Sequence, residues 1–428
     1  MNPNKLKILL LIEQCNPEWA SVPLVGFNFY NSIRDLVDTQ LVTHERNRNA
    51  LEKVSNDFKI DYIKESSLIK TYYQLMKKMT SFIKGTNWPL LHTLSFPVYA
   101  GFNREVYKRY SRKVLASEYD IVHAITPMIP RYPVKIIEAC KSTPFILGPV
   151  NGGIPFPSGF QDTARKEYAH FNFLRGFSKF IPGYTKTYKN ADMVLSGSTY
   201  TLKMLTGLFC PSKLNIELFF ENGIKKEFLS APEKSNEETL ELLFVGRLVP
   251  YKGADMVIEA LAKIRKTAKS KVHLTIVGDG PEKSRLEKQA KDLDINNMID
   301  FTGWIDQGET FKYYKKSDIF CFPSVREFGG AVVLEAMACG TPSIVIDHGG
   351  IGEYVTGNSG FKIQPLSREH IINEMAEKVC LLADDNELRY KFAQNAFKRG
   401  ELFEWNKKAG ALLDIYQRVI EKRHLVTV

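Results

Sequence analysis

The feature that most constrains this chain is a regular alternation of short apolar runs with longer amphipathic stretches. The runs have the length of strands and are apolar on both faces, as in strands buried within a parallel sheet. Predicted strands occupy Lys7–Ile12, Ile121–Ile125, Phe145–Leu147, Met193–Ser196, Leu242–Val245, Leu274–Val277, Ile319–Phe322 and Ser343–Ile346. Helical patterns between them include Ala254–Arg265, Glu282–Leu293 and Ala331–Cys339. This alternation predicts α/β units with right-handed crossovers.

The alternation runs twice, which predicts two domains in a chain of 428 residues. One series fills residues 5 to about 200, and the second fills 240 to about 365. The turn signal Asn222-Gly223 and the polar stretch Ala231–Glu238 separate the two series. We therefore predict domains at 1–222 and 223–403, followed by a helix at the end of the chain.

Composition excludes several other classes of protein. Hydrophobic residues make up 44% and charged residues 25%, which is ordinary for a globular domain and unlike a disordered, collagenous or coiled-coil chain. The six cysteines form no Cys-x-x-Cys pair, which favours a reducing compartment over a disulfide framework or a zinc ribbon. The apolar run at Ile8–Ile12 is too short for a signal peptide, so we expect a cytoplasmic protein.

The net charge of +10 is confined to one half of the sequence. Residues 1–222 hold 28 Lys and Arg against 18 Asp and Glu, whereas residues 223–428 hold 30 of each kind. Basic residues alternate with aromatic ones in 70–113 and again in 171–189. This pattern suits an anionic membrane surface at the inner face of the cell membrane. The alternatives are a solvated basic face or a soluble anionic partner. Nucleic acid is not expected, because no nucleic-acid motif accompanies the charge.

The densest chemical signal follows the predicted strand Ile319–Phe322. A loop carries Glu327, and Gly329-Gly330 lead into a helix that bears Glu335. Such a glycine-rich turn presents backbone N–H groups at a helix N-terminus, which suits a phosphate, and a neighbouring carboxylate can bind sugar hydroxyls. A capped turn without a ligand is the structural alternative.

Two further clusters follow predicted strands. The first contains Gly246, Arg247 and Lys252, and its two cations could offset the charge of a diphosphate and stabilise a departing phosphate. The second is the tight turn Gly278-Asp279-Gly280. All three clusters follow the carboxyl ends of parallel strands, where α/β proteins bind ligands.

Together these motifs resemble the family 4 (group 1) retaining glycosyltransferases of GT-B fold. Glu327 to Glu335 fits the Glu-x7-Glu motif of that family. Further matches in family order are Val245–Leu248 with Lys252-Gly253, Val277–Pro281, Phe301–Trp304, Gly349–Glu353 and Phe403–Trp405. The likeness is dense over about 240–365. In the first half it rests on Asp120–His123, Ala191–Ser198 and Glu221–Ile224.

The resemblance implies two facing Rossmann-like, doubly wound domains with a cleft between them. It implies that domain 1–222 binds the acceptor, with a terminal helix at about 404–428 packing back on it, and that 223–403 binds a nucleotide-diphosphate sugar. The implied catalytic residues are Glu327, His123, Arg247 and Lys252. The implied donor-binding residues are Gly26, Gly246, Arg247, Lys252, Gly278, Asp279, Gly280, Trp304, Phe328, Gly329, Gly330 and Glu335.

Within that scheme Arg247 and Lys252 contact the diphosphate, Glu335 holds the ribose, and Glu327 contacts the donor sugar. His123 faces the sugar from the first domain. Configuration is retained by front-face attack, so no side-chain base is assigned. No cofactor and no metal are expected, and the donor is a UDP-, GDP- or ADP-sugar. Asp292 and Asp294 superficially match a metal-binding Asp-x-Asp motif, but they lie at the end of a polar helix and are interpreted as structural.

The sequence therefore predicts a retaining glycosyltransferase whose acceptor is a glycan or a lipid-linked glycan, in surface polysaccharide or glycoconjugate assembly. Two alternatives stay open. One is a nucleotide-sugar epimerase of the same fold, and the other is a non-catalytic subunit that binds a nucleotide sugar. A dinucleotide oxidoreductase is disfavoured, because no Gly-x-Gly-x-x-Gly follows the first strand.

Overall fold

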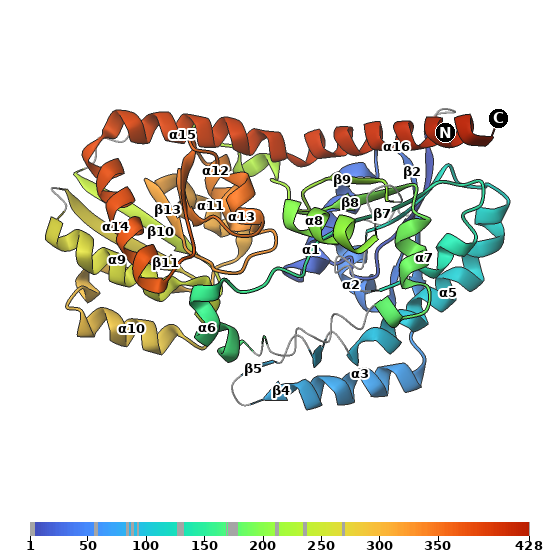
Figure 1. Ribbon diagram of the computed structural model, residues 1–428, viewed down its shortest axis with the longest axis horizontal. Helices are drawn as coiled ribbons and strands as arrows, with labels where there is room; N and C mark the ends of the chain where they lie inside the picture. Colours follow the sequence, from blue (N-terminus) through green and yellow to red (C-terminus); the bar gives the residue numbers. More distant parts are fainter. Residues whose placement is uncertain are drawn as a thin grey trace. The chain divides into compact units, whose positions relative to one another are not determined.

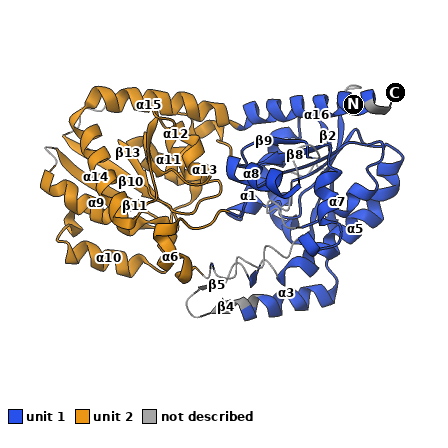
Figure 2. Ribbon diagram, in the orientation of Figure 1, with its two compact units in different colours: residues 1–153, 168–221, 405–428 blue, residues 154–167, 222–404 orange. Residues whose placement is uncertain are grey.

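The structure is a computed structural model of the full chain. It describes residues 5–54, 59–82, 85–86, 90–91, 94–125, 132–167, 169, 179–209, 214–233, 238–267 and 270–427. The chain divides into two compact units, coloured in Figure 2. Unit 1 comprises 1–153, 168–221 and 405–428, and unit 2 comprises 154–167 and 222–404.

Unit 1 is built on a parallel sheet. Among the described residues, seven strands lie in the order β3-β2-β1-β6-β7-β8-β9. These strands are β1 (Lys7–Leu11), β2 (Asp38–His44), β3 (Ile60–Ile63), β6 (Ile121–Ala124), β7 (Phe145–Val150), β8 (Met193–Ser196) and β9 (Ile216–Leu218). The short strands β4 (Ser81–Phe82) and β5 (Gly85–Thr86) pair separately in antiparallel fashion.

Helices cover both faces of this sheet (Figure 1). They are α1 (Val22–Ile33), α2 (Arg48–Val54), α3 (Ser67–Thr80), α5 (Phe96–Leu115), α7 (Tyr184–Lys189), α8 (Thr199–Phe209) and α16 (Trp405–Thr427). Alternate residues of β1 enter opposite cores. Ile8 and Leu10 pack with α1 and α16, whereas Leu9 and Leu11 pack with α5, α7 and α8. A strand buried on both faces must be apolar throughout, which is why β1 has no polar face.

Unit 2 has a parallel sheet of the same kind. Its described strands lie in the order β12-β11-β10-β13-β14-β15. They are β10 (Thr239–Val245), β11 (Lys271–Val277), β12 (Ile299–Gly303), β13 (Ile319–Phe322), β14 (Ser343–Ile346) and β15 (Gly360–Ile363). The order reverses between β10 and β13, and such a switch point opens a crevice at the carboxyl ends of the strands.

The helices of unit 2 lie on both sides of its sheet (Figure 1). They are α6 (Gln161–Lys166), α9 (Ala254–Thr267), α10 (Lys283–Asp292), α11 (Gln307–Lys316), α12 (Ala331–Ala338), α13 (Gly350–Tyr354), α14 (Arg368–Asp384) and α15 (Asn386–Gly400). Helix α9 packs with α10 and with α14, and α12 packs with α11, α13 and α15.

The boundaries between the units fall at 221/222 and 404/405, beside the predicted 222 and 403. The sequence did not predict that 154–167 would leave the first series and pack in unit 2. All eight predicted strands are present, with ends that differ by a few residues. Within the described residues, no helix combines the length and apolarity needed to cross a membrane.

Candidate functional site

The candidate site lies at the carboxyl edge of the sheet in unit 2. The loop after β10 carries Arg247 and the short helix η7 (Pro250–Lys252), and the loop after β13 carries Glu327. These two strands flank the switch point, so their loops meet there. Backbone hydrogen bonds fix the meeting, since Val325 N–H donates to the Tyr251 carbonyl over 3.0 Å.

Lys252 and Glu327 form an ion pair at this point. Only 14% and 15% of their side-chain surfaces are exposed. Burial by itself would lower the pKa of Lys252, but the facing carboxylate outweighs it, so the pKa lies above its ordinary value. Ser324 Oγ donates a second hydrogen bond to the Glu327 carboxylate, over 3.3 Å. The lysine therefore stays charged at neutral pH and holds the carboxylate beside the β10 loop.

Arg247 lies on the same loop and is exposed. Its guanidinium donates to the Tyr251 hydroxyl over 3.2 Å. An exposed guanidinium beside a buried ammonium offers two cations to one anionic ligand, and the planar fork of arginine suits phosphate oxygens.

Glu335 occupies a different environment, inside α12. The side chain is 6% exposed, and its two oxygens accept hydrogen bonds from Gln307 Nε2 (2.6 Å) and Tyr314 Oη (2.9 Å). Burial raises the pKa of the Glu335 carboxyl, although these two donors and the charge of Lys225 oppose the shift. Neither Gln307 nor Tyr314 was singled out from the sequence, because their contact with Glu335 bridges 28 and 21 residues.

The glycines at the site have backbone roles. Gly330 precedes α12 with φ 60°, a left-handed conformation, and a Cβ there would lie 2.8 Å from Glu327 Cγ. Gly278 has φ 143°, and a Cβ would lie 1.9 Å from the Gly246 carbonyl oxygen. The loops after β10 and β11 can approach this closely only because both positions lack side chains.

The remaining predicted donor-binding residues also lie on the carboxyl-edge loops of unit 2. Asp279 is exposed, and its carboxylate accepts from Gly280 N–H over 2.6 Å. Trp304 follows β12 and is 67% exposed. Phe328 and Gly329 continue the Glu327 loop toward α12, and the Glu327 carbonyl accepts from Gly350 N–H over 3.1 Å.

His123 and Gly26 belong to unit 1, and both contact other residues of that unit. The His123 imidazole is fully buried within β6, and its nitrogens contact Tyr416 Oη (2.8 Å) and the Gly148 carbonyl (2.7 Å). Burial lowers the pKa of His123 to about 4, which keeps the ring neutral. Both ring nitrogens thus have partners within unit 1, and the role of His123 toward the donor sugar stays a prediction.

Gly26 lies at a close contact between a helix and a loop. It lies inside α1, and a Cβ there would come 2.4 Å from the Gln14 carbonyl oxygen. The glycine lets α1 pack against the loop that follows β1. The contact of Gly26 with phosphate stays a prediction.

The segment 154–167 is a part of the site that sequence reasoning missed. Arg326, next to Glu327, donates from Nε to the Ile154 carbonyl over 3.0 Å. Its guanidinium also lies over the rings of Phe156 (5.0 Å) and Phe328 (5.3 Å). Near Arg326 and Arg247, burial raises the pKa of Glu167, and the two cations oppose that shift. No local pattern in 154–167 indicates this distant partner.

Comparisons with known proteins agree with this geometry. Residues 225–399 match the family described as "Glycosyl transferases group 1". D-inositol 3-phosphate glycosyltransferase 2 of Catenulispora acidiphila is 33% identical over 190 residues, which cover 42% of this chain and 43% of that protein. The matched part is thus less than half the length of that curated relative.

Solved structures resemble the chain over nearly all its length. HepE of Anabaena, in complex with UDP and glucose, has a TM-score of 0.61 at 16% identity and covers 96% of this chain and 100% of its own. Sucrose-phosphate synthase of Thermosynechococcus elongatus has a TM-score of 0.63 at 17% identity, with 98% and 100% covered. At such identities the likeness establishes the fold. The fold of this chain is GT-B, and its residues 225–399 match the group 1 glycosyltransferase family.

Proposed function

We propose that the chain is a retaining glycosyltransferase that moves a sugar from a nucleotide-diphosphate sugar to a glycan or lipid-linked glycan acceptor. The observation that carries this proposal is the meeting of Arg247, Lys252 and Glu327 at the switch point of unit 2. Cations and a carboxylate side by side suit the two halves of such a donor, its diphosphate and its sugar hydroxyls.

The proposed chemistry needs little from protein acids or bases. The bond between the sugar C1 and the diphosphate oxygen breaks, and the acceptor oxygen bonds to C1 on the same face. The acceptor proton passes to the departing phosphate. Arg247 and Lys252 stabilise the negative charge that develops there, which is the electrostatic role that a metal has in other transferases. Glu327 orients the sugar, and Glu335 accepts hydrogen bonds from the ribose hydroxyls.

UDP-sugars are the first donors to test, because HepE was solved with UDP and with UDP-glucose. A panel of UDP, GDP, ADP and their sugars can be compared by thermal shift, since a ligand that binds only the folded state raises the melting temperature. The proposal predicts a rise with one base and with the corresponding sugar. No rise with any member of the panel would contradict it.

Product analysis then separates the activity from its alternatives. Incubated with donor and a glycan acceptor mixture, a transferase releases nucleoside diphosphate and forms a glycoside of unchanged anomeric configuration. An epimerase converts the donor without any acceptor. A binding subunit does neither, although it binds the nucleotide sugar.

We further propose that the protein works in the cytoplasm, attached peripherally to an anionic membrane surface. Helix α3 supports this idea, because Leu68, Leu75 and Met79 are 83%, 56% and 61% exposed and recur at helical spacing. Lys70 and Lys78 on the same helix are also exposed. An apolar stripe beside basic residues suits the interface of an anionic bilayer. Trp88 and residues 171–178 of the predicted basic-aromatic segments lie outside the described residues.

A further inference from the structure

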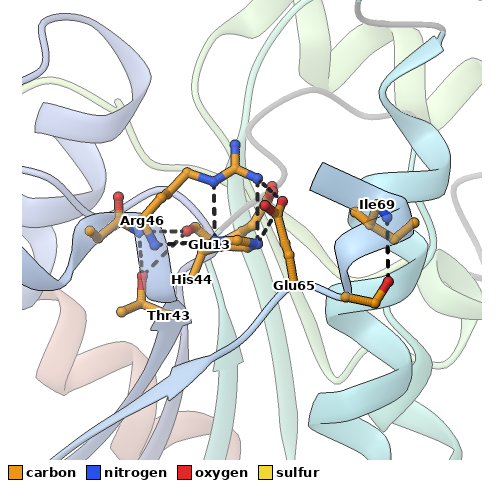
Figure 3. Close-up of polar contacts among 8 residues, drawn as sticks. Glu13, Thr43, His44, Arg46, Glu65 and Ile69 are labelled. Atoms are coloured by element: carbon orange, nitrogen blue, oxygen red, sulfur yellow. Dashed lines mark hydrogen bonds and ion pairs between the residues drawn. The ribbon is translucent and has the colours of Figure 1, made fainter. Parts of the chain in front are cut away.

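A second cluster of polar side chains lies in unit 1, at the carboxyl ends of three neighbouring strands. Glu13 follows β1, His44 ends β2, and Glu65 follows β3. These strands are adjacent in the order β3-β2-β1, so the three side chains converge on one edge, together with Arg46 (Figure 3). Carboxyl edges of parallel sheets are where ligands bind, yet the proposed donor chemistry uses none of these residues.

The backbone holds the cluster in place. The Glu13 carbonyl accepts hydrogen bonds from the amide of Asn47 (2.9 Å) and the hydroxyl of Thr43 (3.3 Å), and both donors are fully buried. The loops after β1 and β2 are therefore fixed to each other. Because the loops are already ordered before a ligand binds, less conformational entropy is lost on binding.

His44 has a defined role within the cluster. Its Nδ1 accepts hydrogen bonds from Arg46, through the backbone N–H (3.3 Å) and through Nε (3.1 Å). Because Nδ1 accepts, the ring hydrogen lies on Nε2, which is 2.9 Å from Glu65 Oε1. The imidazole thus orients both Arg46 and Glu65.

Arg46 and Glu65 each keep an atom available. Nη2 of Arg46 pairs with Oε1 of Glu65, the same oxygen that His44 contacts. Over the part of the chain that the structure describes, neither Arg46 Nη1 nor Glu65 Oε2 has a hydrogen-bond partner. The two side chains are 20% and 12% exposed. A donor and an acceptor therefore lie side by side with part of their surface open to solvent.

The charge of the cluster indicates what it can hold. Glu13 and Glu65 provide two carboxyl groups against the single guanidinium of Arg46. Burial raises the pKa of Glu13, although Arg46 and His44 oppose the shift. Even with Glu13 protonated, the Arg46–Glu65 pair has no net charge, so the cluster offers no excess positive charge to a phosphate. Neutral hydroxyl groups fit better, because each can donate to a carboxylate and accept from a guanidinium.

We propose that Arg46 and Glu65 bind two neighbouring hydroxyl groups of a neutral sugar, the terminal residue of the acceptor. One hydroxyl donates to Glu65 Oε2, and the oxygen of the next accepts from Arg46 Nη1. His44 is a positioning residue, because it acts through these two side chains. The inference rests on the proposed transferase function and adds the chemical class of sugar that unit 1 recognises.

Ligand-detected NMR tests this site without a known acceptor. The probes are the methyl glycosides of glucose, galactose, mannose and N-acetylglucosamine, with methyl glucuronide as the anionic comparison, each with saturating UDP. The variants are Arg46→Gln and Glu65→Gln. Glu217→Gln is the matched control, because it removes a carboxylate from β9 at the other edge of the same sheet. The melting temperature and the UDP affinity of each variant are first compared with those of wild type. If Glu65→Gln lowers either value, Glu65→Asp is used in its place.

We expect at least one neutral glycoside to bind wild type and Glu217→Gln equally, and to bind both test variants roughly 10-fold or more weakly. Equal binding to all proteins would overturn the proposal, as would no binding of any neutral glycoside or a preference for the glucuronide. A signal lost in Glu327→Gln but kept in Glu65→Gln would place the sugar at the donor site and also overturn it. Failure of wild type to bind any nucleoside diphosphate instead counts against the proposed function. The binding of the glycosides to wild type and to the variants then still tests the Arg46–Glu65 site.

Discussion

At the scale of single residues, the two carboxylates of the Glu-x7-Glu pattern are not equivalent. Glu327 faces the Lys252 ammonium, and Ser324 donates to it. Glu335 is buried beside neutral donors, and burial raises the pKa of its carboxyl. In the proposed function, the Lys252–Glu327 pair therefore lies beside the diphosphate and the donor sugar, whereas Glu335 accepts hydrogen bonds from the ribose hydroxyls.

Replacing Glu335 with Gln should weaken nucleotide binding through the ribose. A hydrogen bond to a charged group is worth about 1.5–3 kcal/mol, so UDP affinity should fall roughly 10- to 150-fold. Calorimetry with UDP and with 2′-deoxy-UDP gives the specific readout. Wild type should bind 2′-deoxy-UDP more weakly than UDP. The variant should bind 2′-deoxy-UDP with nearly the same affinity as wild type does, because this ligand lacks the hydroxyl group that Glu335 would bind. Glu369→Gln, an exposed change on α14, is the control. Equal UDP affinity in Glu335→Gln and wild type would disprove the ribose role.

A buried lysine in α16 provides a pH prediction. Lys408 donates to the Phe220 carbonyl over 2.6 Å and lies 4.2 Å from the Phe219 ring centroid. Burial lowers the pKa of Lys408 to about 7, from 10.5 in an unfolded chain, with the charge of Glu221 opposing the shift. Between these pH values the unfolded state binds more protons, so this lysine makes the folded state more stable as pH rises from about 7 toward 10.

The variant Lys408→Met should remove that dependence. The free energy of unfolding of wild type should gain on the order of 1 kcal/mol per pH unit relative to the variant above pH 7, and nothing below it. Urea denaturation at pH 6, 7, 8 and 9 measures the difference. Lys422→Met, an exposed change on the same helix, should keep the wild-type slope. Parallel curves for wild type and Lys408→Met would show that the lysine is charged in the folded state.

At the scale of elements, the sequence predicts what is buried on both faces and misses what is half exposed. Strands β1, β6, β8, β13 and β14 are apolar runs and were predicted. Strands β2, β12 and β15 were not predicted, because Asp38–His44, Ile299–Gly303 and Gly360–Ile363 mix polar and apolar residues. Two of these, β12 and β15, lie at sheet edges, where only part of the strand is buried.

The candidate site also contains residues that the sequence singles out and residues that it does not. The loops at β10 and β13 were predicted because their charged and glycine residues follow apolar strands. Three features depend on tertiary contacts that no local pattern reports: the burial of His123 against Tyr416, the contact of 154–157 with Arg326, and the Arg46–Glu65 pair. Residues distant in the sequence come together there, so composition and periodicity carry no information about them.

The turn before α12 gives a prediction at this scale. In Gly330→Ala the new Cβ would lie 2.3 Å from Ile351 Cγ2 and 2.8 Å from Glu327 Cγ, at φ 60°. The backbone must shift or pay about 1–2 kcal/mol for the left-handed conformation, and either outcome displaces Glu327. We expect a lower melting temperature and weaker binding of the donor sugar. Gly308→Ala, at the start of α11 with open space around it, should leave both unchanged or slightly improved. Wild-type donor binding in Gly330→Ala would contradict the proposed geometry.

At the scale of the whole molecule, charge separates along the sequence. Residues 1–222 carry the entire excess of +10, and α3 adds an exposed apolar stripe to it. Several basic residues of this half form ion pairs, among them Arg46 with Glu65 and Arg109 with Asp61. The exposed Lys70, Lys78 and Lys108 are the better candidates for contact with lipid.

Changing Lys70, Lys78 and Lys108 together to Gln should reduce binding to anionic vesicles. Each lysine near such a surface contributes about 1 kcal/mol, so the triple change should lower the partition coefficient by roughly 100-fold. Co-sedimentation with phosphatidylserine-containing and neutral vesicles at low and high salt measures it. The matched control changes Lys288 and Lys291 of α10, in unit 2, to Gln and should pellet like wild type. Equal pelleting with anionic and neutral vesicles would contradict the proposal that the basic residues of 1–222 bind anionic lipid.

The most direct test of the central claim is calorimetric binding of nucleoside diphosphates, with magnesium and with excess chelator. Wild type should bind one of UDP, GDP or ADP equally under both conditions, because Arg247 and Lys252 supply the positive charge. Lys252→Met and Arg247→Met should each bind it roughly 10- to 150-fold more weakly, while Lys288→Met binds as wild type does. Binding that requires magnesium, unchanged binding in both cation variants, or no binding by wild type would contradict the account.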